Sequence, residues 1–182
     1  MLRGLSRRTA VALVAACIAL VAVTAAVAAP TQPRASTASL TSLEQGVLTD
    51  INAFRAQHGL VPLHLSVALT TAAREHSDQM ATQGYFAHES ADGSAFWKRI
   101  QRFYAAGSAR YWSVGENLLW SSPDIDPSGA LKLWIASPEH KANLLTARWR
   151  EIGVSAVHVA AAPGAYRGLD VTIVTTDFGV RH

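Results

Sequence analysis

The distribution of apolar and polar positions after residue 40 predicts helices first and strands later. Apolar residues recur three and four positions apart over residues 43–54, and a capping box at Thr41-Ser42-Leu43-Glu44 marks the start of that helix. The same spacing returns over residues 66–84, where a glycine ends the pattern. Two shorter helices are expected over residues 96–105 and 129–137.

Three strand signals lie in the second half of the chain. Residues 114–120 and 152–159 alternate between apolar and polar side chains, and residues 169–174 are rich in β-branched side chains. Pro163-Gly164 separates the last two segments, which favours an antiparallel hairpin with a long loop. Because helices and strands do not alternate as βαβ units, we expect an α+β domain in which helices cover at least one face of an antiparallel sheet.

Residues 1–28 have the pattern of a secretory signal peptide. An apolar stretch over residues 11–23 follows three arginines and leads into Ala26-Val27-Ala28, which has the small side chains typical of a cleavage site. The stretch is short for a membrane span, since a bilayer core needs about 20 apolar residues. We therefore expect cleavage after Ala28, a flexible, proline-bearing leader over residues 29–39, and an exported domain over residues 40–182.

Two variants of this export prediction remain open. Val14-Ala15-Ala16-Cys17 fits a lipoprotein cleavage site, which would leave the protein attached to the cell surface through Cys17, although the apolar region before it is short. Ser6-Arg7-Arg8 fits a twin-arginine signal, which exports proteins after folding. Both variants still place the domain outside the cytoplasm.

Charge and cysteine content exclude several classes of function. The chain has 182 residues with 16 Lys+Arg and 13 Asp+Glu, and three of the arginines belong to the predicted signal peptide, which leaves 13 basic and 13 acidic side chains. This neutral domain lacks the basic surface that nucleic acid or an anionic membrane requires. The single cysteine, Cys17, lies in the signal peptide, so disulfides and thiol chemistry are excluded. We expect a monomer without nucleic acid and without a membrane span.

Glu116 is the most informative charged residue. It falls in phase with Val114, Leu118 and Trp120 on the predicted strand, so its carboxylate lies on a face that should be apolar. A charge buried on that face needs a partner or a cation. The alternative is that the face is exposed to solvent. Gly115, directly before the glutamate, indicates a close approach of another segment to the backbone.

Three histidines differ in their surroundings. His88 follows aromatic residues on a predicted loop, a position typical of pocket walls, and His140 lies just after Pro138, which can open a new helix. Each of these two can equally be a surface histidine without a partner. His76 lies on the apolar side of the helix over residues 66–84, where we expect a hydrogen-bonded core residue rather than a ligand. Phosphate-binding glycine loops, metalloprotease helix motifs and serine-nucleophile motifs are absent from the sequence.

A series of different short segments follows in a fixed order along the chain between residues 43 and 180. In chain order they are Asn52-Ala53-Phe54-Arg55, His58-Gly59-Leu60, Pro62-Leu63, His76-Ser77, Met80, Phe86-Ala87-His88, Gly115-Glu116-Asn117-Leu118, Trp134, Ser137-Pro138, His140, Glu151-Ile152-Gly153-Val154 and Asp177-Phe178-Gly179. Each segment is a weak signal alone. Together they resemble the CAP superfamily of cysteine-rich secretory proteins, antigen 5 and pathogenesis-related 1 proteins, whose domain is also called SCP. Without cysteines in the domain, the chain is similar to the short bacterial members.

The resemblance implies a three-layer α-β-α sandwich around a central antiparallel sheet, with a cleft across one side. It also implies that His88, Glu116 and His140 line this cleft and hold zinc or another divalent cation, since the family's cleft carries two histidines and two glutamates. Ser137 stands where the second glutamate is expected, and Glu139 is near but adjacent to His140. Three of the four expected cleft residues are therefore present.

The function implied by the resemblance is that of a secreted, extracellular module that binds a ligand or a partner. Lipids, sterols and cell-surface components are the ligand classes to which the family is linked. No catalytic residue is assigned, and we expect no turnover of peptide or ester substrates. The alternative is a metal-dependent, protease-like hydrolase that uses His88, Glu116 and His140. In a third interpretation these residues only satisfy one another's hydrogen bonds.

Overall fold

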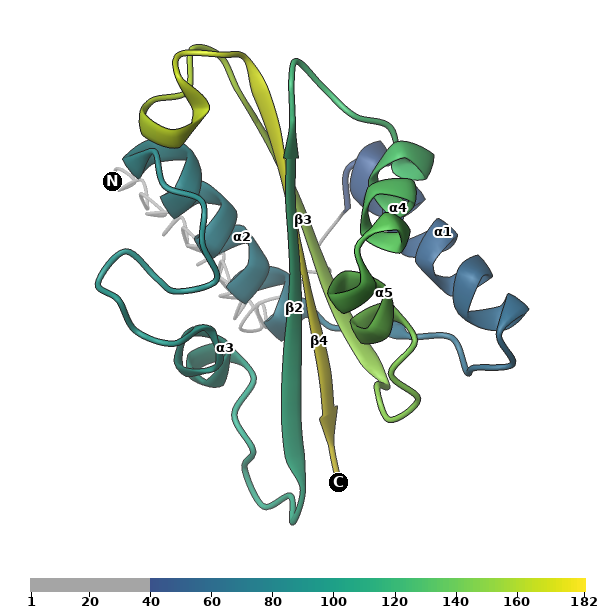
Figure 1. Ribbon diagram of the computed structural model, residues 1–182. Helices are drawn as coiled ribbons and strands as arrows, with labels where there is room; N and C mark the ends of the chain where they lie inside the picture. Colours follow the sequence, from purple (N-terminus) through teal and green to yellow (C-terminus); the bar gives the residue numbers. More distant parts are fainter. Residues whose placement is uncertain (1–39) are drawn as a thin grey trace, which may run out of the picture. The chain divides into compact units, whose positions relative to one another are not determined.

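A four-stranded sheet lies between two layers of helices (Figure 1). The computed structural model describes residues 40–182, so the predicted signal peptide (1–28) and leader (29–39) lie outside the described residues. The strands are β1 (His64–Leu65), β2 (Trp112–Ser121), β3 (Glu151–Val159) and β4 (Val171–Arg181), in the order β1-β3-β4-β2 across the sheet. The α+β class and the sandwich architecture are confirmed.

The helices divide between the two faces of the sheet. Helices α1 (Ser42–Gln57), α4 (Pro127–Ala136) and α5 (Pro138–Leu144) lie on one face, and α2 (Val67–Gln83) and α3 (Phe96–Phe103) lie on the other (Figure 1). The four expected helices are present, and Pro138 does open a further helix. Among residues 40–182, no helix is both long enough and apolar enough to cross a bilayer.

The long strands are antiparallel, as expected, but the sheet also has a parallel edge. β4 pairs with β2 and with β3 in antiparallel register, and Glu116 of β2 lies opposite Asp177 of β4. The extra strand β1 pairs with β3 in parallel through two residues only, which is too short to show a periodicity in the sequence. β4 continues to Arg181, past the expected end at Val174, because its polar segment Thr175-Thr176-Asp177 is buried within the sheet.

The hydrophobic core is built on both faces of β4. Every residue over 171–180 is buried. Val174 packs in a cluster with Trp134 of α4, while Ile173 packs on the opposite face in a cluster with Met80 of α2. A central strand of this kind holds the two helical layers in fixed positions on either side of the sheet.

Glu44 joins the start of α1 to β3 and α2. Its carboxylate completes the expected capping box by accepting the N–H of Thr41 at 2.8 Å. The same buried carboxylate accepts the N–H of Ala156 on the outer edge of β3 at 3.0 Å, and it pairs with Arg74 of α2 at 3.0 Å. This cluster covers the edge of β3 beyond the short β1, where backbone groups would otherwise be unpaired.

Helix α2 lies very close to β3. A Cβ atom added to Gly153 would stand 2.1 Å from the backbone carbon of Leu69, so only glycine permits this approach. As expected, α2 begins behind Ser66 and ends at Gly84, whose φ of 70° suits glycine. His76, further along the same helix, is fully buried.

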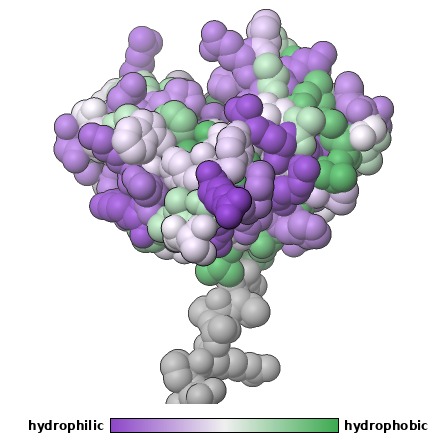
Figure 2. All heavy atoms as spheres, turned by 90° about the horizontal axis from the view of Figure 1, so that it is seen from below, coloured by the Kyte–Doolittle hydropathy of each residue, from purple (hydrophilic) through white to green (hydrophobic). Residues whose placement is uncertain are grey.

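The domain surface seen from below is largely hydrophilic, with a smaller hydrophobic area toward one side (Figure 2). Large hydrophobic side chains that are exposed come from separate elements, for example Val67 of α2, Trp97 of α3 and Leu133 of α4. Isolated apolar side chains of this kind are normal on a protein surface.

Candidate functional site

A groove of about 450 Å³ lies over the edge strand β2, between the loop that precedes α3 and helix α5. His88, Glu116 and His140, the three residues singled out from the sequence, all line this groove. Glu139, the neighbour of His140, lines it as well. In Figure 1, β2 lies between α3 and α5, so the two walls of the groove come from the two helical layers. The geometry brings the three residues together, and their role there stays a prediction.

Strand β2 sends alternate side chains to the two sides of the sheet. Glu116 points toward α2 and α3, while Gly115 and Asn117 face α5. A Cβ atom on Gly115 would stand 2.7 Å from Oδ1 of Asn143, so the expected close approach at this glycine is confirmed. Asn117 donates its Nδ2 hydrogen to the carbonyl oxygen of His140 at 3.1 Å and thereby holds α5 against the strand.

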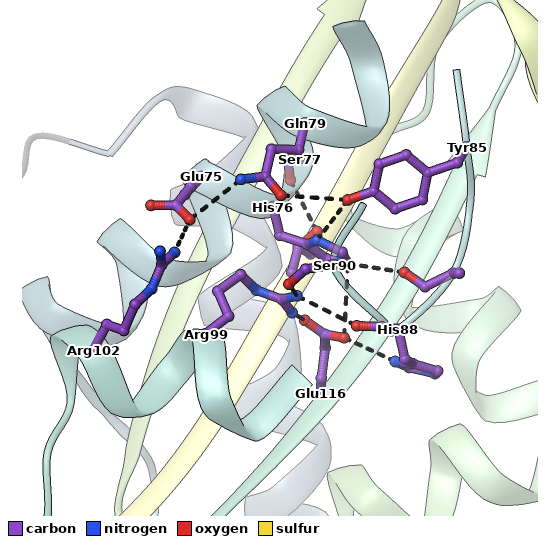
Figure 3. Close-up of polar contacts among 12 residues, drawn as sticks. Glu75, His76, Ser77, Gln79, Tyr85, His88, Ser90, Arg99, Arg102 and Glu116 are labelled. Carbon is purple, nitrogen blue, oxygen red and sulfur yellow. Dashed lines mark hydrogen bonds and ion pairs between the residues drawn. The ribbon is translucent and has the colours of Figure 1, made fainter. Parts of the chain in front are cut away.

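The Glu116 carboxylate is fully buried and paired, which rules out the alternative of a solvent-exposed face. Arg99 of α3, also buried, donates to Oε2, and the Nδ1 of His88 lies 2.8 Å from Oε1 (Figure 3). Nε2 of His76 lies 4.0 Å from the same Oε1. The expectation that a charge at this position needs a partner is therefore confirmed, and the main partner is an arginine.

The His88 imidazole is held by Glu116 at one end and open at the other. A carboxylate only accepts hydrogen bonds, so Nδ1 of His88 carries the proton that is donated to Oε1. This hydrogen bond raises the pKa of His88 above its ordinary 6.5, against the opposing effect of burial. The side chain is 46% exposed. In the neutral ring, Nε2 is thus left as a hydrogen-bond acceptor or metal ligand on the groove side.

His76 is a core residue, as expected from its place on α2. Its Nε2 donates to the carbonyl oxygen of Ala87 at 2.9 Å, one residue before His88. Burial lowers the pKa of His76 to about 4, so the ring is neutral at physiological pH. His76 therefore fixes the backbone next to His88, and its ring also lies close to the Glu116 carboxylate.

His140 approaches the groove from α5. Burial lowers its pKa, and the neighbouring charge of His88 lowers it further. Its ring makes no hydrogen bond with any other residue of the described part of the chain. The two imidazoles thus face a common groove from opposite walls, and neither uses its full hydrogen-bonding capacity within the domain.

Sequence reasoning missed Arg99, which organises the site. Besides Glu116, its guanidinium donates to the carbonyl oxygen of His88 at 3.3 Å and to the hydroxyl of Ser90 at 3.1 Å (Figure 3). A signal was present, because Arg99 falls on the same helical stripe as Phe96, Ile100 and Phe103. A cation on an apolar stripe needs a buried anion, just as Glu116 needed a buried cation.

Asp177 is a second buried acid beside Glu116. It lies directly opposite Glu116 on β4, and neither of its carboxyl oxygens has a hydrogen-bond partner among residues 40–182. Burial, together with the nearby negative charge of Glu116, raises its pKa. Both effects favour the neutral carboxylic acid over the carboxylate, which reduces the repulsion between the two acids.

The donor set for a metal ion is narrower than the sequence suggested. Both carboxylate oxygens of Glu116 are engaged, one by Arg99 and one by His88. In the part of the chain that the structure describes, no three His, Cys, Asp or Glu side chains are arranged to surround one ion. The imidazoles of His88 and His140 remain free to bind a cation in the groove, and the exposed carboxylates of Glu89 and Glu139 lie on its walls. A metal site at these residues stays a prediction.

Comparison with known proteins identifies the family of this fold. The sequence model of the CAP family, described as the cysteine-rich secretory protein family, matches residues 48–174. Since this range covers well over half of the chain, the protein belongs to the CAP family.

Two curated relatives come from Bacillus subtilis (strain 168). The uncharacterized protein YkwD is 29% identical over 118 residues, which are 65% of this chain and 44% of the relative. The uncharacterized membrane protein YlbC is 27% identical over 114 residues, which are 63% of this chain and 31% of the relative. The chain therefore spans less than half the length of these relatives.

Solved structures share the fold. An extracellular protein containing a SCP domain from Bacillus anthracis str. Ames has a TM-score of 0.56 at 26% identity, over 74% of this chain and 39% of its own. An outer surface protein from Borrelia burgdorferi has a TM-score of 0.57 at 19% identity, over 76% of this chain and 92% of its own. The second likeness concerns the fold alone.

Proposed function

We propose that the protein is an extracellular binding module and that its ligand site is the groove over β2. The observation that carries this proposal is the half-exposed imidazole of His88, which is fixed by the buried pair of Glu116 and Arg99 and opens onto the groove. A polar group held in one orientation at a groove wall is the usual means of specific recognition. The extracellular protein from Bacillus anthracis that shares the fold supports this location.

A divalent cation such as zinc is one ligand that this groove can bind. His88 and His140 would supply the two imidazole ligands, and Glu116 would orient His88, because metal-binding histidines almost always donate their second N–H to a carboxylate or carbonyl. The exposed carboxylates of Glu89 and Glu139 on the groove walls would add negative potential. Such an ion would supply a Lewis acid that holds an anionic or carbonyl-bearing partner in the groove.

The groove favours a polar ligand over a sterol or a lipid tail. Phe96 is the one large apolar side chain on its walls within the described residues, whereas the others carry carboxylate, imidazole or carboxamide groups or are glycine. An apolar ligand would take the carboxylates of Glu89 and Glu139 and the ring of His140 out of water without giving them hydrogen-bond partners. A polar cell-surface component therefore fits the groove better than the lipid classes linked to the family.

Calorimetric titration with Zn²⁺ tests the cation part of the proposal. We expect micromolar binding by the purified protein, which His88→Ala and His140→Ala both abolish. Glu116→Gln should weaken binding by about 10-fold to 100-fold, the usual effect of removing the group that orients a ligand histidine. His64→Ala, a change at an exposed histidine on β1, is the matched control and should bind as wild type. Unchanged binding in His88→Ala would refute the assignment.

A metal-dependent hydrolase is the second candidate. The observation that favours it is the hydrogen bond from His88 to a buried carboxylate, which is how histidines are oriented and made more basic for proton transfer. Assays of peptide and ester hydrolysis with and without Zn²⁺ separate the two functions. A binding module shows no turnover in either condition, whereas a hydrolase shows turnover that His88→Ala removes.

A further inference from the structure

A second pocket, of about 310 Å³, opens between the end of α2, the turn over residues 90–94 and helix α3. It is distinct from the groove over β2, since the two share no lining residue. Its walls carry the carboxamides of Gln79 and Gln83, the side chains of Ser90, Asp92 and Ser94, and three cations, Lys98, Arg99 and Arg102. Such a volume accommodates a small ligand or the end of a larger one.

The charges around this pocket leave one cation unpaired. Arg99 pairs with Glu116, and Arg102 pairs with Glu75, and neither of these carboxylates lines the pocket (Figure 3). Lys98 forms no ion pair with any residue of the described range 40–182. Of the three wall cations, Lys98 is therefore the one that lacks a negatively charged partner among residues 40–182, whereas Arg99 and Arg102 are neutralised from outside the pocket.

The turn that closes the pocket is already in place. Ser90 N donates to the carbonyl oxygen of Ser94 at 2.9 Å, and Gly93 N donates to that of Ser90 at 2.8 Å. Asp92 accepts the N–H of Ser94 at 2.9 Å, and the Arg99 guanidinium donates to the Ser90 hydroxyl at 3.1 Å. Asp92 forms no ion pair with Lys98, and one of its oxygens is engaged within the turn. A ligand would enter a pocket whose backbone needs no rearrangement.

We propose that this pocket binds an oxyanion group, a carboxylate or a phosphate, with Lys98 as its direct partner. Arg99 and Arg102 line the same walls although each is paired with a carboxylate outside the pocket, and the Gln83 amide, which has no hydrogen-bond partner within residues 40–182, can donate to the same oxyanion. The proposal goes beyond the groove over β2, because it concerns a separate pocket with the opposite preference for charge.

The two sites are linked by the ion pair that separates them. Arg99 lines the second pocket, and its partner Glu116 lines the groove. An anion close to Arg99 competes with Glu116 for the same positive charge, and it therefore affects the carboxylate that orients His88. Since coupling between two sites is reciprocal, a ligand in the groove would also change the anion affinity.

Nuclear magnetic resonance titration of the purified protein tests the proposal. Sodium phosphate and sodium acetate are added separately, with sodium chloride at matched ionic strength as the reference, while the Gln83 side-chain amide and the Arg99 Nε–H are followed. We expect saturable shifts with phosphate or with acetate that chloride does not reproduce, and the stronger of the two identifies the class of oxyanion.

Variants decide whether the shifts come from this pocket. Lys98→Gln should weaken the anion affinity by about threefold to tenfold, the range for one partly solvated charged contact. Lys132→Gln, the same change at an exposed lysine on α4, should have no effect. Gln83→Ala is a second variant at an exposed position, so a poorly folded Lys98→Gln would not end the test. Wild-type affinity in both pocket variants, or an equal response to chloride, would overturn the proposal.

Discussion

Replacing Arg99 by methionine should destabilise the domain far more than any exposed arginine does. Methionine fills much of the same space but leaves the Glu116 carboxylate, which is fully buried, without its main cation. It also removes the hydrogen bonds to the His88 carbonyl and the Ser90 hydroxyl. The loop that carries His88 therefore loses two of its connections to α3 at the same time.

The size of the effect follows from the burial of both partners. The Arg99 and Glu116 side chains are 1% and 0% exposed. Removing one partner of such a pair costs about 3–5 kcal/mol, because the remaining charge is left uncompensated. Domains have a total stability of about 5–15 kcal/mol, so the loss is a large fraction of it. At about 3 °C per kcal/mol for a domain of this size, the melting temperature should fall by about 10–15 °C.

Urea unfolding at pH 7, followed by the fluorescence of the five tryptophans, measures the free energy of unfolding. Arg102→Met is the matched control, since Arg102 lies one turn further along α3 in an ion pair whose side chains are 60% and 30% exposed. Such an exposed pair contributes about 1 kcal/mol or less. The double variant Arg99→Met with Glu116→Gln should recover part of the loss, because no buried charge remains unpaired.

Equal losses in Arg99→Met and Arg102→Met would contradict this reasoning. So would a double variant whose loss is the sum of the two single losses, since additivity means that the two side chains do not interact. In either case the site would not be organised by a buried ion pair, and the orientation of His88 would need another explanation.

Three further predictions concern single side chains. Glu116→Gln should lower the pKa of His88, which a pH titration of its ring proton signals measures. In the wild type the pKa is raised, so protonated His88 stabilises the fold below pH 6.5. This contribution disappears as the pH rises through the pKa of the folded state. His76 is neutral in the fold down to about pH 4, so stability should decrease as the pH falls from 6.5 toward 4, and His76→Gln should flatten that part of the curve. Glu44→Gln should lower the free energy of unfolding by about 1–3 kcal/mol, because Arg74 loses its charged partner and the N–H of Ala156 loses a charged acceptor. An unchanged midpoint of urea unfolding would count against this prediction.

The helices were predictable because their ends carry local signals. The capping box of Thr41 and Glu44 and the left-handed Gly84 mark the limits of α1 and α2 within a few neighbouring residues. The end of β4 was not predictable in this way. The polar segment Thr175-Thr176-Asp177 has the composition of a loop, and only its position between β2 and β3 keeps it extended and buried.

The candidate site was predictable in part. Glu116 was found from the phase of the strand, and Arg99 could have been found from the phase of α3, because each places a charge on an apolar face. That the two charges neutralise each other is a tertiary fact that no local pattern contains. The local surroundings of His88 and His140 fit a pocket wall and a surface position equally well, so the prediction that the two meet in one groove came from the family resemblance.

The position of the groove follows from how the sheet edges are closed. Side chains from two helical layers can reach a common ligand only beyond the edge of the sheet that separates them. At the β3 edge, Glu44 and Arg74 meet across the gap and fill it. At the β2 edge, the helices of one layer satisfy the outward carbonyls instead, because Asn143 donates to Glu116 O and Trp134 donates to Leu118 O, each at 3.1 Å. These hydrogen bonds prevent another strand from pairing with β2. They do not join the two helical layers across the edge, so the space that His88 and His140 share stays open.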